Sequence, residues 1–152
     1  MSDFTLFYTD DDYDDLSMFA DALECIGKKI SLHTFDSADK LLKTLQNQPI
    51  IPNILFLDLN MPGKNGFDVL EVLRSDKNQA SIPVIVYSTA MDNAVIKQCL
   101  EAGANYFMTK PILMQDLVEC IEYALSIDWK HFKANLNNFV YKGPKVKTAK
   151  NN

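Results

Sequence analysis

Short apolar runs alternate along this chain with segments whose apolar residues recur every three or four positions. The second pattern predicts amphipathic helices; it is clear at Leu16, Phe19 and Leu23, after which Gly27 is a natural C-terminal stop. The apolar runs predict five strands, over residues 4–8, 30–35, 54–57, 84–87 and 106–108. The helical patterns cover approximately residues 16–26, 38–45, 67–73, 95–100 and 113–125. Because the strands are apolar at nearly every position, we expect a parallel sheet covered by helices on both faces.

Residues that favour helix starts and turns lie between these segments. Ser37 is placed to cap the second helix, and Asp12 to begin the first, where a carboxylate favours the positive end of the helix dipole. Pro49 and Pro52 interrupt the chain before the third strand, and a turn-rich loop covers residues 61–66. The pattern predicts one α/β domain whose units repeat in architecture and not in sequence.

Polar side chains follow four of the five predicted strands, at the point where each strand ends. They are Asp10, Asp11 and Asp12 after the first strand, Asp58 after the third, Ser88 and Thr89 after the fourth, and Lys110 after the fifth. Right-handed crossovers place the ends of parallel strands along one edge of the sheet, where ligand sites form. We therefore expect a pocket for a divalent cation and a phosphoryl group at this edge.

The three adjacent aspartates predict a cation site because their charges repel one another unless a cation lies nearby. Oxygen ligands suit a hard ion, Mg²⁺ before Ca²⁺. Alternate side chains at a strand end point in different directions. We therefore expect Asp11 to bind the ion directly, and Asp10 to bind it through water or to accept a hydrogen bond from one of the ligands. Asp12 is expected to start the helix. A cluster that only caps the helix is the alternative.

Asp58 ends an apolar strand, so its carboxylate must be solvated, paired or coordinated. With Mg²⁺ beside it, its oxygen can attack phosphorus in line and become an acyl phosphate. Ser88 offers a hydroxyl to a phosphoryl oxygen, although Thr89 competes for this role. Lys110 offers a cation that can pair with Asp58 before transfer and with the phosphoryl group afterwards. Each residue alone has a structural or solvated alternative; their combination indicates phosphoryl chemistry.

Composition narrows the class of protein. The chain has 152 residues, 47% of them hydrophobic, which suits one buried core. Its formal charge of −5 argues against general attraction to nucleic acid or to an anionic membrane. Cys25, Cys99 and Cys120 lie within helical patterns, so we expect buried thiols. No apolar stretch approaches the roughly 18 residues that span a bilayer, and we expect a cytoplasmic protein without membrane association or direct DNA binding.

Four motifs together resemble the receiver domain of two-component response regulators, over about residues 4–125. The motifs are the acidic cluster at 10–12, LDLNMPGKNGF at 57–67, IPVIVYS at 82–88 and GANYFMTKP at 103–111. The resemblance implies a flavodoxin-like, doubly wound α/β fold, with a five-stranded parallel sheet in the order 2-1-3-4-5 and five helices. It also implies a phosphorelay switch, in which a histidine kinase or a histidine phosphotransfer protein phosphorylates Asp58.

The same resemblance implies the roles of single residues. The Mg²⁺ ligands would be Asp10, Asp11, Asp58 and the main-chain carbonyl of Asn60. Ser88 and Lys110 would bind the phosphoryl group, and Phe107, in preference to Tyr106, would be the switch aromatic. Phosphorylation adds roughly one to two negative charges. Ser88 would then turn toward the phosphoryl group and Phe107 would move in from the solvent side, changing the face formed by the fourth helix, the fifth strand and the fifth helix.

Two residues differ from those most frequent in the family, and a third bears on the lifetime of the phosphorylated form. Ser88 replaces the more frequent threonine and keeps the hydroxyl. Phe107 replaces the frequent tyrosine, so that an inward ring makes no hydroxyl hydrogen bond. Ala90, together with Asn60, lies where the family controls how water reaches the acyl phosphate. The lifetime of the phosphorylated form is therefore left open.

About 25 residues follow the last helix of the predicted domain, which we place at residues 3–127. Trp129, Phe132, Leu136 and Phe139 recur at helical spacing, so we expect a helical extension over residues 128–141. It would either pack on its own domain or form a surface for a partner or a homodimer. Residues 142–152 contain four lysines and are expected to be a disordered basic tail. Such a chain resembles a stand-alone receiver whose output is an unknown protein target.

Two other classes of protein compete with this interpretation. One is a Mg²⁺-dependent phosphohydrolase of the haloacid dehalogenase type, which needs a second aspartate where Asn60 stands. The other is a receiver-like interaction module that is never phosphorylated. We expect no conventional enzyme activity beyond catalysis of the protein's own phosphotransfer and dephosphorylation.

Overall fold

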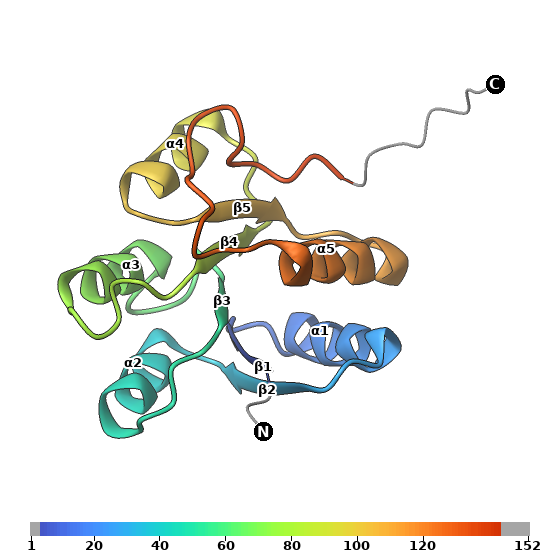
Figure 1. Cartoon of the computed structure of the whole chain (residues 1–152), viewed down its shortest axis with the longest axis horizontal. Helices are drawn as coiled ribbons and strands as arrows, with labels where there is room; N and C mark the ends of the chain where they lie inside the picture. The colour runs from blue at the N-terminus through green and yellow to red at the C-terminus, as the bar shows by residue number, and fades with distance from the viewer. Residues whose placement is uncertain (1–3, 144–152) are drawn as a thin grey trace.

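A five-stranded sheet lies between two layers of helices in the computed structural model, which describes residues 4–143 (Figure 1). The strands are β1 (Phe4–Thr9), β2 (Ile30–Phe35), β3 (Ile54–Leu57), β4 (Val84–Ser88) and β5 (Tyr106–Thr109). The helices are α1 (Tyr13–Ile26), α2 (Ala38–Asn47), α3 (Gly66–Ser75), α4 (Asn93–Glu101) and α5 (Met114–Ser126). All strand pairs are parallel, in the order β2-β1-β3-β4-β5. The predicted flavodoxin-like fold is confirmed.

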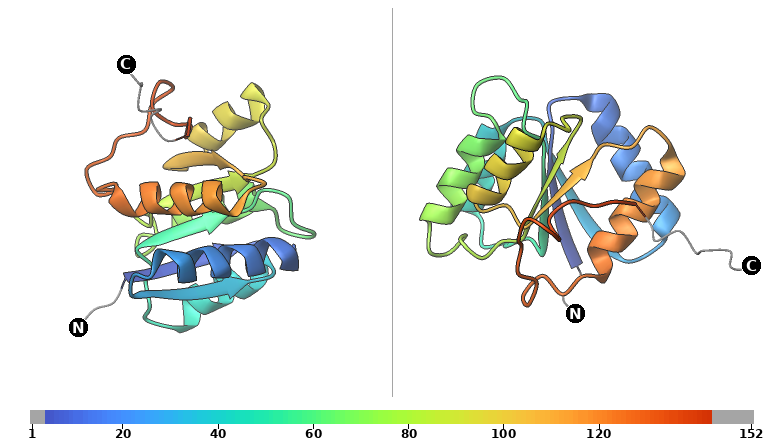
Figure 2. Two further views of the ribbon diagram at one scale, coloured as in Figure 1. Left: turned by 90° about the vertical axis from the view of Figure 1, so that its right-hand side faces the viewer. Right: turned by 90° about the horizontal axis from the view of Figure 1, so that it is seen from above.

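Each face of the sheet carries its own core, which explains why the inner strands β1, β3 and β4 are largely apolar. Leu6 and Tyr8 of β1 pack in the core shared with α1 and α5, whereas Phe7 between them packs in the core shared with α2, α3 and α4. The two views of Figure 2 show these helix layers on opposite sides of the sheet. Strands buried on both faces cannot show the alternation of a half-exposed sheet.

Local signals in the sequence end and begin the helices where they were expected. The Asp12 side chain accepts a hydrogen bond from the Asp15 amide at 3.0 Å and caps α1. Ser37 caps α2 in the same way, through the Lys40 amide at 3.2 Å. Gly27 ends α1 with a φ of 70°, in the left-handed region that glycine adopts without strain.

The helix predicted over residues 128–141 does not form, and this prediction was wrong. Residues 127–143, here called the C-terminal strap, consist of turns and extended chain. Asn135 and Asn138 explain the difference. The Asn135 side chain accepts hydrogen bonds from the amides of Asn137 and Asn138, and Asn138 donates to the Lys133 carbonyl at 2.9 Å. Such side-chain contacts compete with helical hydrogen bonding.

The C-terminal strap packs on its own domain, the first of the two alternatives. Trp129 is buried and its indole N–H donates to the Ala124 carbonyl at 2.9 Å. Trp129 and Phe132 both pack against the ring of Tyr106. Trp129 and Phe132 thus join the core on the side of α1 and α5, whereas Phe139 joins the core on the side of α2, α3 and α4, so the regular spacing does not mark one helix face.

The strap also pairs with the outer edge of β5. The Phe107 amide donates to the Phe139 carbonyl, and the Tyr141 amide donates to the Phe107 carbonyl, each at 2.9 Å. These two hydrogen bonds form a parallel bridge between Phe107 and Val140. In Figure 1 the strap leaves α5 and passes along this edge of the sheet. An edge strand that otherwise exposes unpaired groups is thereby covered.

The expectation of three buried cysteine thiols is confirmed for two of them. Cys99 and Cys120 are buried, as predicted, but Cys25 is exposed on α1. Burial raises the pKa of the Cys99 thiol to about 11 and that of the Cys120 thiol to about 12.

Between residues 4 and 143, no helix combines the length and the apolar character needed to cross a membrane. Residues 144–152, which include most of the predicted basic tail, lie outside the described part of the chain.

Candidate phosphoacceptor site

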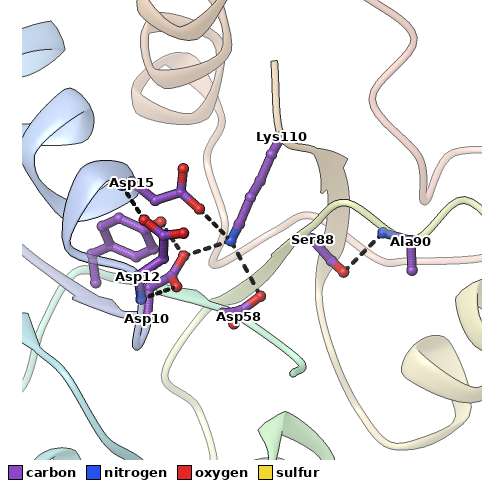
Figure 3. Close-up of polar contacts among 8 residues, drawn as sticks. Asp10, Asp12, Asp15, Asp58, Ser88, Ala90 and Lys110 are labelled. Atoms are coloured by element: carbon purple, nitrogen blue, oxygen red, sulfur yellow. Dashed lines mark hydrogen bonds and ion pairs between the residues drawn. The ribbon is translucent and has the colours of Figure 1, made fainter. Parts of the chain in front are cut away.

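Backbone hydrogen bonds join the strand ends that carry the polar residues. The Asp58 amide donates to the Thr9 carbonyl at 3.0 Å, and the Lys110 amide donates to the Ser88 carbonyl at 2.9 Å. Asp58 is thereby fixed next to the acidic loop after β1, and Lys110 next to the end of β4. Figure 3 shows Asp10, Asp58, Ser88 and Lys110 at this one edge of the sheet. The predicted convergence of distant segments is present in the structure.

Three carboxylates form a compact cluster at this edge. Asp10, Asp11 and Asp58 each offer an oxygen within 4.8 Å of the others. Asp10 is fully buried, Asp58 is 4% exposed, and Asp11 is exposed. An all-oxygen donor set of this size, open to solvent on one side, fits a hard divalent cation such as Mg²⁺. Asn60, from which a main-chain ligand was expected, lies two residues beyond Asp58 in an exposed part of the loop.

Lys110 provides the counter-charge of the cluster. Its Nζ lies 2.6 Å from Asp10 Oδ2, 2.8 Å from Asp15 Oδ2 and 3.4 Å from Asp58 Oδ1. Burial alone would lower the pKa of Lys110, but the contacts with Asp10 and Asp15 and the charge of Asp58 outweigh burial and raise the pKa. The lysine therefore stays protonated at any physiological pH and remains a cation beside the carboxylate of Asp58.

Asp58 is held in a state that favours neutralisation of its charge. Burial, and then the negative charge of Asp10, raise the pKa of Asp58 to about 6, although Lys110 opposes this rise. A carboxylate in this position is less stable than one in water. A bound cation relieves this electrostatic cost, because it offsets the buried negative charge.

Asp10 is fixed by contacts on both of its carboxylate oxygens. The Tyr8 hydroxyl donates to Oδ2 at 2.5 Å, and the Asp12 amide donates to Oδ1 at 3.0 Å. Tyr8 was not predicted as part of the site. The signal for it was a tyrosine in a largely apolar strand, two residues before Asp10, since a buried hydroxyl needs a partner. Burial and the hydrogen bond to Asp10 raise the pKa of Tyr8, so that it remains a donor.

Asp15 is the second residue that was not predicted to lie at the site. It lies in the first turn of α1, three residues after the N-cap residue Asp12. Its carboxylate receives a hydrogen bond from Lys110, 95 residues further along the chain. The available signal was a further acidic residue, the fifth, after Asp10, Asp11, Asp12 and Asp14, within one helical turn of the aspartate cluster.

Among the residues that the structure describes, no hydrogen bond joins Ser88 or Thr89 to the Asp58 carboxylate. Ser88 is fully buried, and its hydroxyl oxygen accepts a hydrogen bond from the Ala90 amide at 3.1 Å. Thr89, the competing hydroxyl, is exposed. The peptide bond between Lys110 and Pro111 is trans, although a cis bond was one expectation.

Phe107 differs from its expected starting position. Its ring is fully buried and lies in the core on the side of α2, α3 and α4, with Phe139 of the strap near it. We expected the ring to begin on the solvent side. The C-terminal strap is the reason for the difference, because it covers the edge at which this ring would otherwise reach solvent.

Gly66 determines how closely α3 approaches the loop that carries Asp58. Its amide donates to the Leu59 carbonyl at 3.0 Å. A Cβ atom at this position would lie 2.8 Å from the Asp58 carbonyl oxygen and 2.9 Å from the Leu59 Cα. Because both of these atoms belong to the backbone, a side chain here would displace the loop. Glycine therefore helps to place Asp58.

Comparison with known proteins assigns the family. The family model of the response regulator receiver domain matches residues 6–122, and this chain belongs to that family. Receiver domains are the phosphorylation-based signalling modules of two-component systems, and this is the class of domain that the chain contains.

Three relatives illustrate the similarity. The DNA-binding transcriptional activator EvgA of Escherichia coli is 39% identical over 89 residues, which are 59% of this chain and 42% of EvgA. The chemotaxis protein CheY1 of Helicobacter pylori is 38% identical over 72 residues, 47% of this chain and 58% of CheY1. The chain thus spans about two fifths of EvgA. The phosphorylated cyanobacterial phytochrome response regulator RcpA has the same fold, with a TM-score of 0.75 and 22% identity over 88% of this chain and 98% of RcpA.

Proposed function

We propose that this protein is a phosphorylation-activated switch in which Asp58 accepts a phosphoryl group from a phosphohistidine donor. The observation that supports this function best is the convergence of Asp58 with Asp10, Asp11 and Lys110 at one edge of the sheet. Bound Mg²⁺, held by the three carboxylates and the main-chain carbonyl of Asn60, would neutralise negative charge on the transferring oxygens.

The transfer step is a displacement at phosphorus. An oxygen of the Asp58 carboxylate forms a bond to phosphorus while the bond between phosphorus and the donor imidazole breaks, and its electron pair returns to the imidazole nitrogen. Lys110 then moves from Asp10 and Asp15 toward the new phosphoryl oxygens, with which it forms charge-assisted hydrogen bonds. Attack of water on phosphorus later breaks its bond to the Asp58 oxygen, which restores the Asp58 carboxylate and releases inorganic phosphate.

Phosphorylation would change the surface around β5. Ser88 gives up the hydrogen bond from the Ala90 amide and turns toward the phosphoryl group. To shift a population from 1:99 to 99:1, the modification must favour the active state by about 5.5 kcal/mol. Because the strap is paired with Phe107, we propose that a rearrangement of this residue is transmitted to the strap as well as to α4. The downstream protein and any homodimer would contact this face.

An apolar rim beside the site suits a protein donor. Tyr13, Met91, Ile112 and Leu113 are exposed by 58–92% and lie on segments that follow β1, β4 and β5, at the edge that carries Asp58. Exposed apolar groups gathered at a polar site mark a protein contact. We propose the cytoplasm as the location, since Cys25, Cys99 and Cys120 are all free thiols, as in a reducing compartment.

The test is Mg²⁺-dependent labelling by acetyl phosphate, followed by intact mass and peptide mapping. We expect one phosphoryl group on Asp58 in the wild type, its loss with EDTA, and no labelling of Asp58→Ala. Asp14→Ala is the matched control, because Asp14 is an exposed aspartate of α1. A wild-type protein that remains unlabelled by acetyl phosphate and by a range of phosphohistidine donors would favour a receiver-like interaction module that is never phosphorylated.

A further inference from the structure

Two carboxylates hold the ammonium group of Lys110 more closely than Asp58 does. The contacts with Asp10 and Asp15 are 2.6 and 2.8 Å long, and the contact with Asp58 is 3.4 Å long. An ammonium group has three donors, and the shorter contacts are the stronger ones. Lys110 is thus next to the phosphoacceptor but is held mainly by its other neighbours.

Asp15 is firmly placed and lies outside the cation cluster. Its amide donates to the capping carboxylate of Asp12 at 3.0 Å, which fixes the first turn of α1. Within the described part of the chain, the carboxylate cluster that can hold a metal contains Asp10, Asp11 and Asp58 but not Asp15. In Figure 3, Asp15 reaches Lys110 from α1, and Asp58 reaches it from another side. The two carboxylates therefore draw the same ammonium group in different directions.

We propose that Asp15 is a positioning residue for phosphotransfer, which restrains Lys110 and competes with the phosphoryl group for its ammonium group. This inference rests on the proposed function. A cation bound at the cluster would interact with Asp10 and so weaken the attraction between Asp10 and Lys110. Asp15 would then be the main carboxylate that keeps Lys110 away from Asp58. Asp15 also partly neutralises Lys110 and so reduces the repulsion between the lysine and a cation at the cluster.

The competition predicts opposite effects on two ligands. Without the Asp15 charge, Lys110 turns toward Asp58, which repels Mg²⁺ and attracts an anionic phosphoryl group. For Asp15→Asn we expect Mg²⁺ to bind roughly three- to tenfold more weakly, and beryllofluoride at saturating Mg²⁺ to bind more tightly by a similar factor. A residue that only stabilised the fold would weaken both ligands or neither.

The experiment is calorimetric titration with Mg²⁺ alone and then with beryllofluoride. The matched control is Asp14→Asn, which removes the same charge from the same helical turn at an exposed position; we expect changes below about twofold. Asp15→Glu, which can still reach the lysine, should restore both affinities in large part. In a Lys110→Gln background, Asp15→Asn should no longer weaken Mg²⁺ binding, since the coupled partner is gone.

Distinct outcomes separate this inference from the proposed function. If wild type binds both ligands and Asp15→Asn behaves like Asp14→Asn, or shifts both affinities in the same direction, the role of Asp15 is wrong and the proposed function stands. If wild type binds neither Mg²⁺ nor beryllofluoride, the proposed function fails and the role of Asp15 fails with it.

Discussion

Phe107 and Phe139 are joined by both backbone and side chain. The Phe107 amide donates to the Phe139 carbonyl at 2.9 Å, and the two ring centroids are 6.5 Å apart. Phe139 is 1% exposed although it lies in a segment without regular secondary structure. Phe107, the predicted switch aromatic, is thus held from outside the sheet by the C-terminal strap, and Phe139 of the strap belongs to the core.

Replacement of Phe139 should therefore destabilise the whole domain. We expect Phe139→Ala to lower the free energy of unfolding by about 3–5 kcal/mol, as truncation of a buried phenylalanine does. Leu136→Ala, in the same strap but 71% exposed, should change it by less than about 0.5 kcal/mol. Urea denaturation measures both values. Equal stability of the two variants would show that the strap does not contribute to the core.

The raised pKa of Asp58 makes stability depend on pH in a defined direction. The folded protein binds the Asp58 proton with a pKa of about 6, above the ordinary value of 3.8. Between pH 4 and pH 6 the folded state therefore holds more protons than the unfolded state, and the contribution of this residue to stability falls as the pH rises. Above pH 6 the cost of the buried charge is fully present.

Asp58→Asn should remove this cost. In EDTA at pH 7 we expect the variant to be more stable than the wild type by roughly 1–3 kcal/mol, with the difference vanishing toward pH 4. Urea denaturation across this pH range measures it, with Asp21→Asn on the exposed surface of α1 as the control. A constant difference at every pH would contradict a raised pKa at Asp58.

The sequence predicted the fold and most of the site for one physical reason. Strands buried on both faces are largely apolar, so a charged residue such as Asp58 at a strand end is conspicuous. The roles of Asp15 and Tyr8 were less accessible, because an acidic first turn and a strand tyrosine both have ordinary explanations. The strap was misassigned because helical spacing at Trp129 and Phe132 fits a helix, whereas local side-chain hydrogen bonds of Asn135 favour turns.

Gly66 provides a test of the position of Asp58 that leaves every charged group in place. In Gly66→Ala the new Cβ would meet the backbone of Asp58 and Leu59 below 3.0 Å. We expect a loss of about 1–3 kcal/mol in stability and slower labelling by acetyl phosphate, because the loop must shift. Gly63→Ala is the control: Gly63 has a φ of 75°, but a Cβ atom there would meet no other atom within 4 Å, so the strain stays local. Similar labelling rates for the two variants would contradict the role of Gly66.

The apolar rim can be tested by separating donor docking from chemistry. Ile112 is 92% exposed and lies two residues after Lys110, so that a charge there would meet an incoming protein but not a small molecule. We expect Ile112→Asp to reduce the rate of transfer from a cognate phosphohistidine protein by roughly tenfold or more, the loss of one buried apolar anchor. Its labelling by acetyl phosphate should remain within about twofold of wild type, since a surface substitution leaves Asp58 and Lys110 in place. Leu136→Asp is the control, because it places the same charge at another exposed apolar residue, on the strap. It should affect neither reaction. Stopped-flow or quenched transfer assays measure the ratio of the variant's rate to the wild-type rate with each donor. An equal loss of rate with both donors would assign Ile112 to the chemistry of the site instead of to docking.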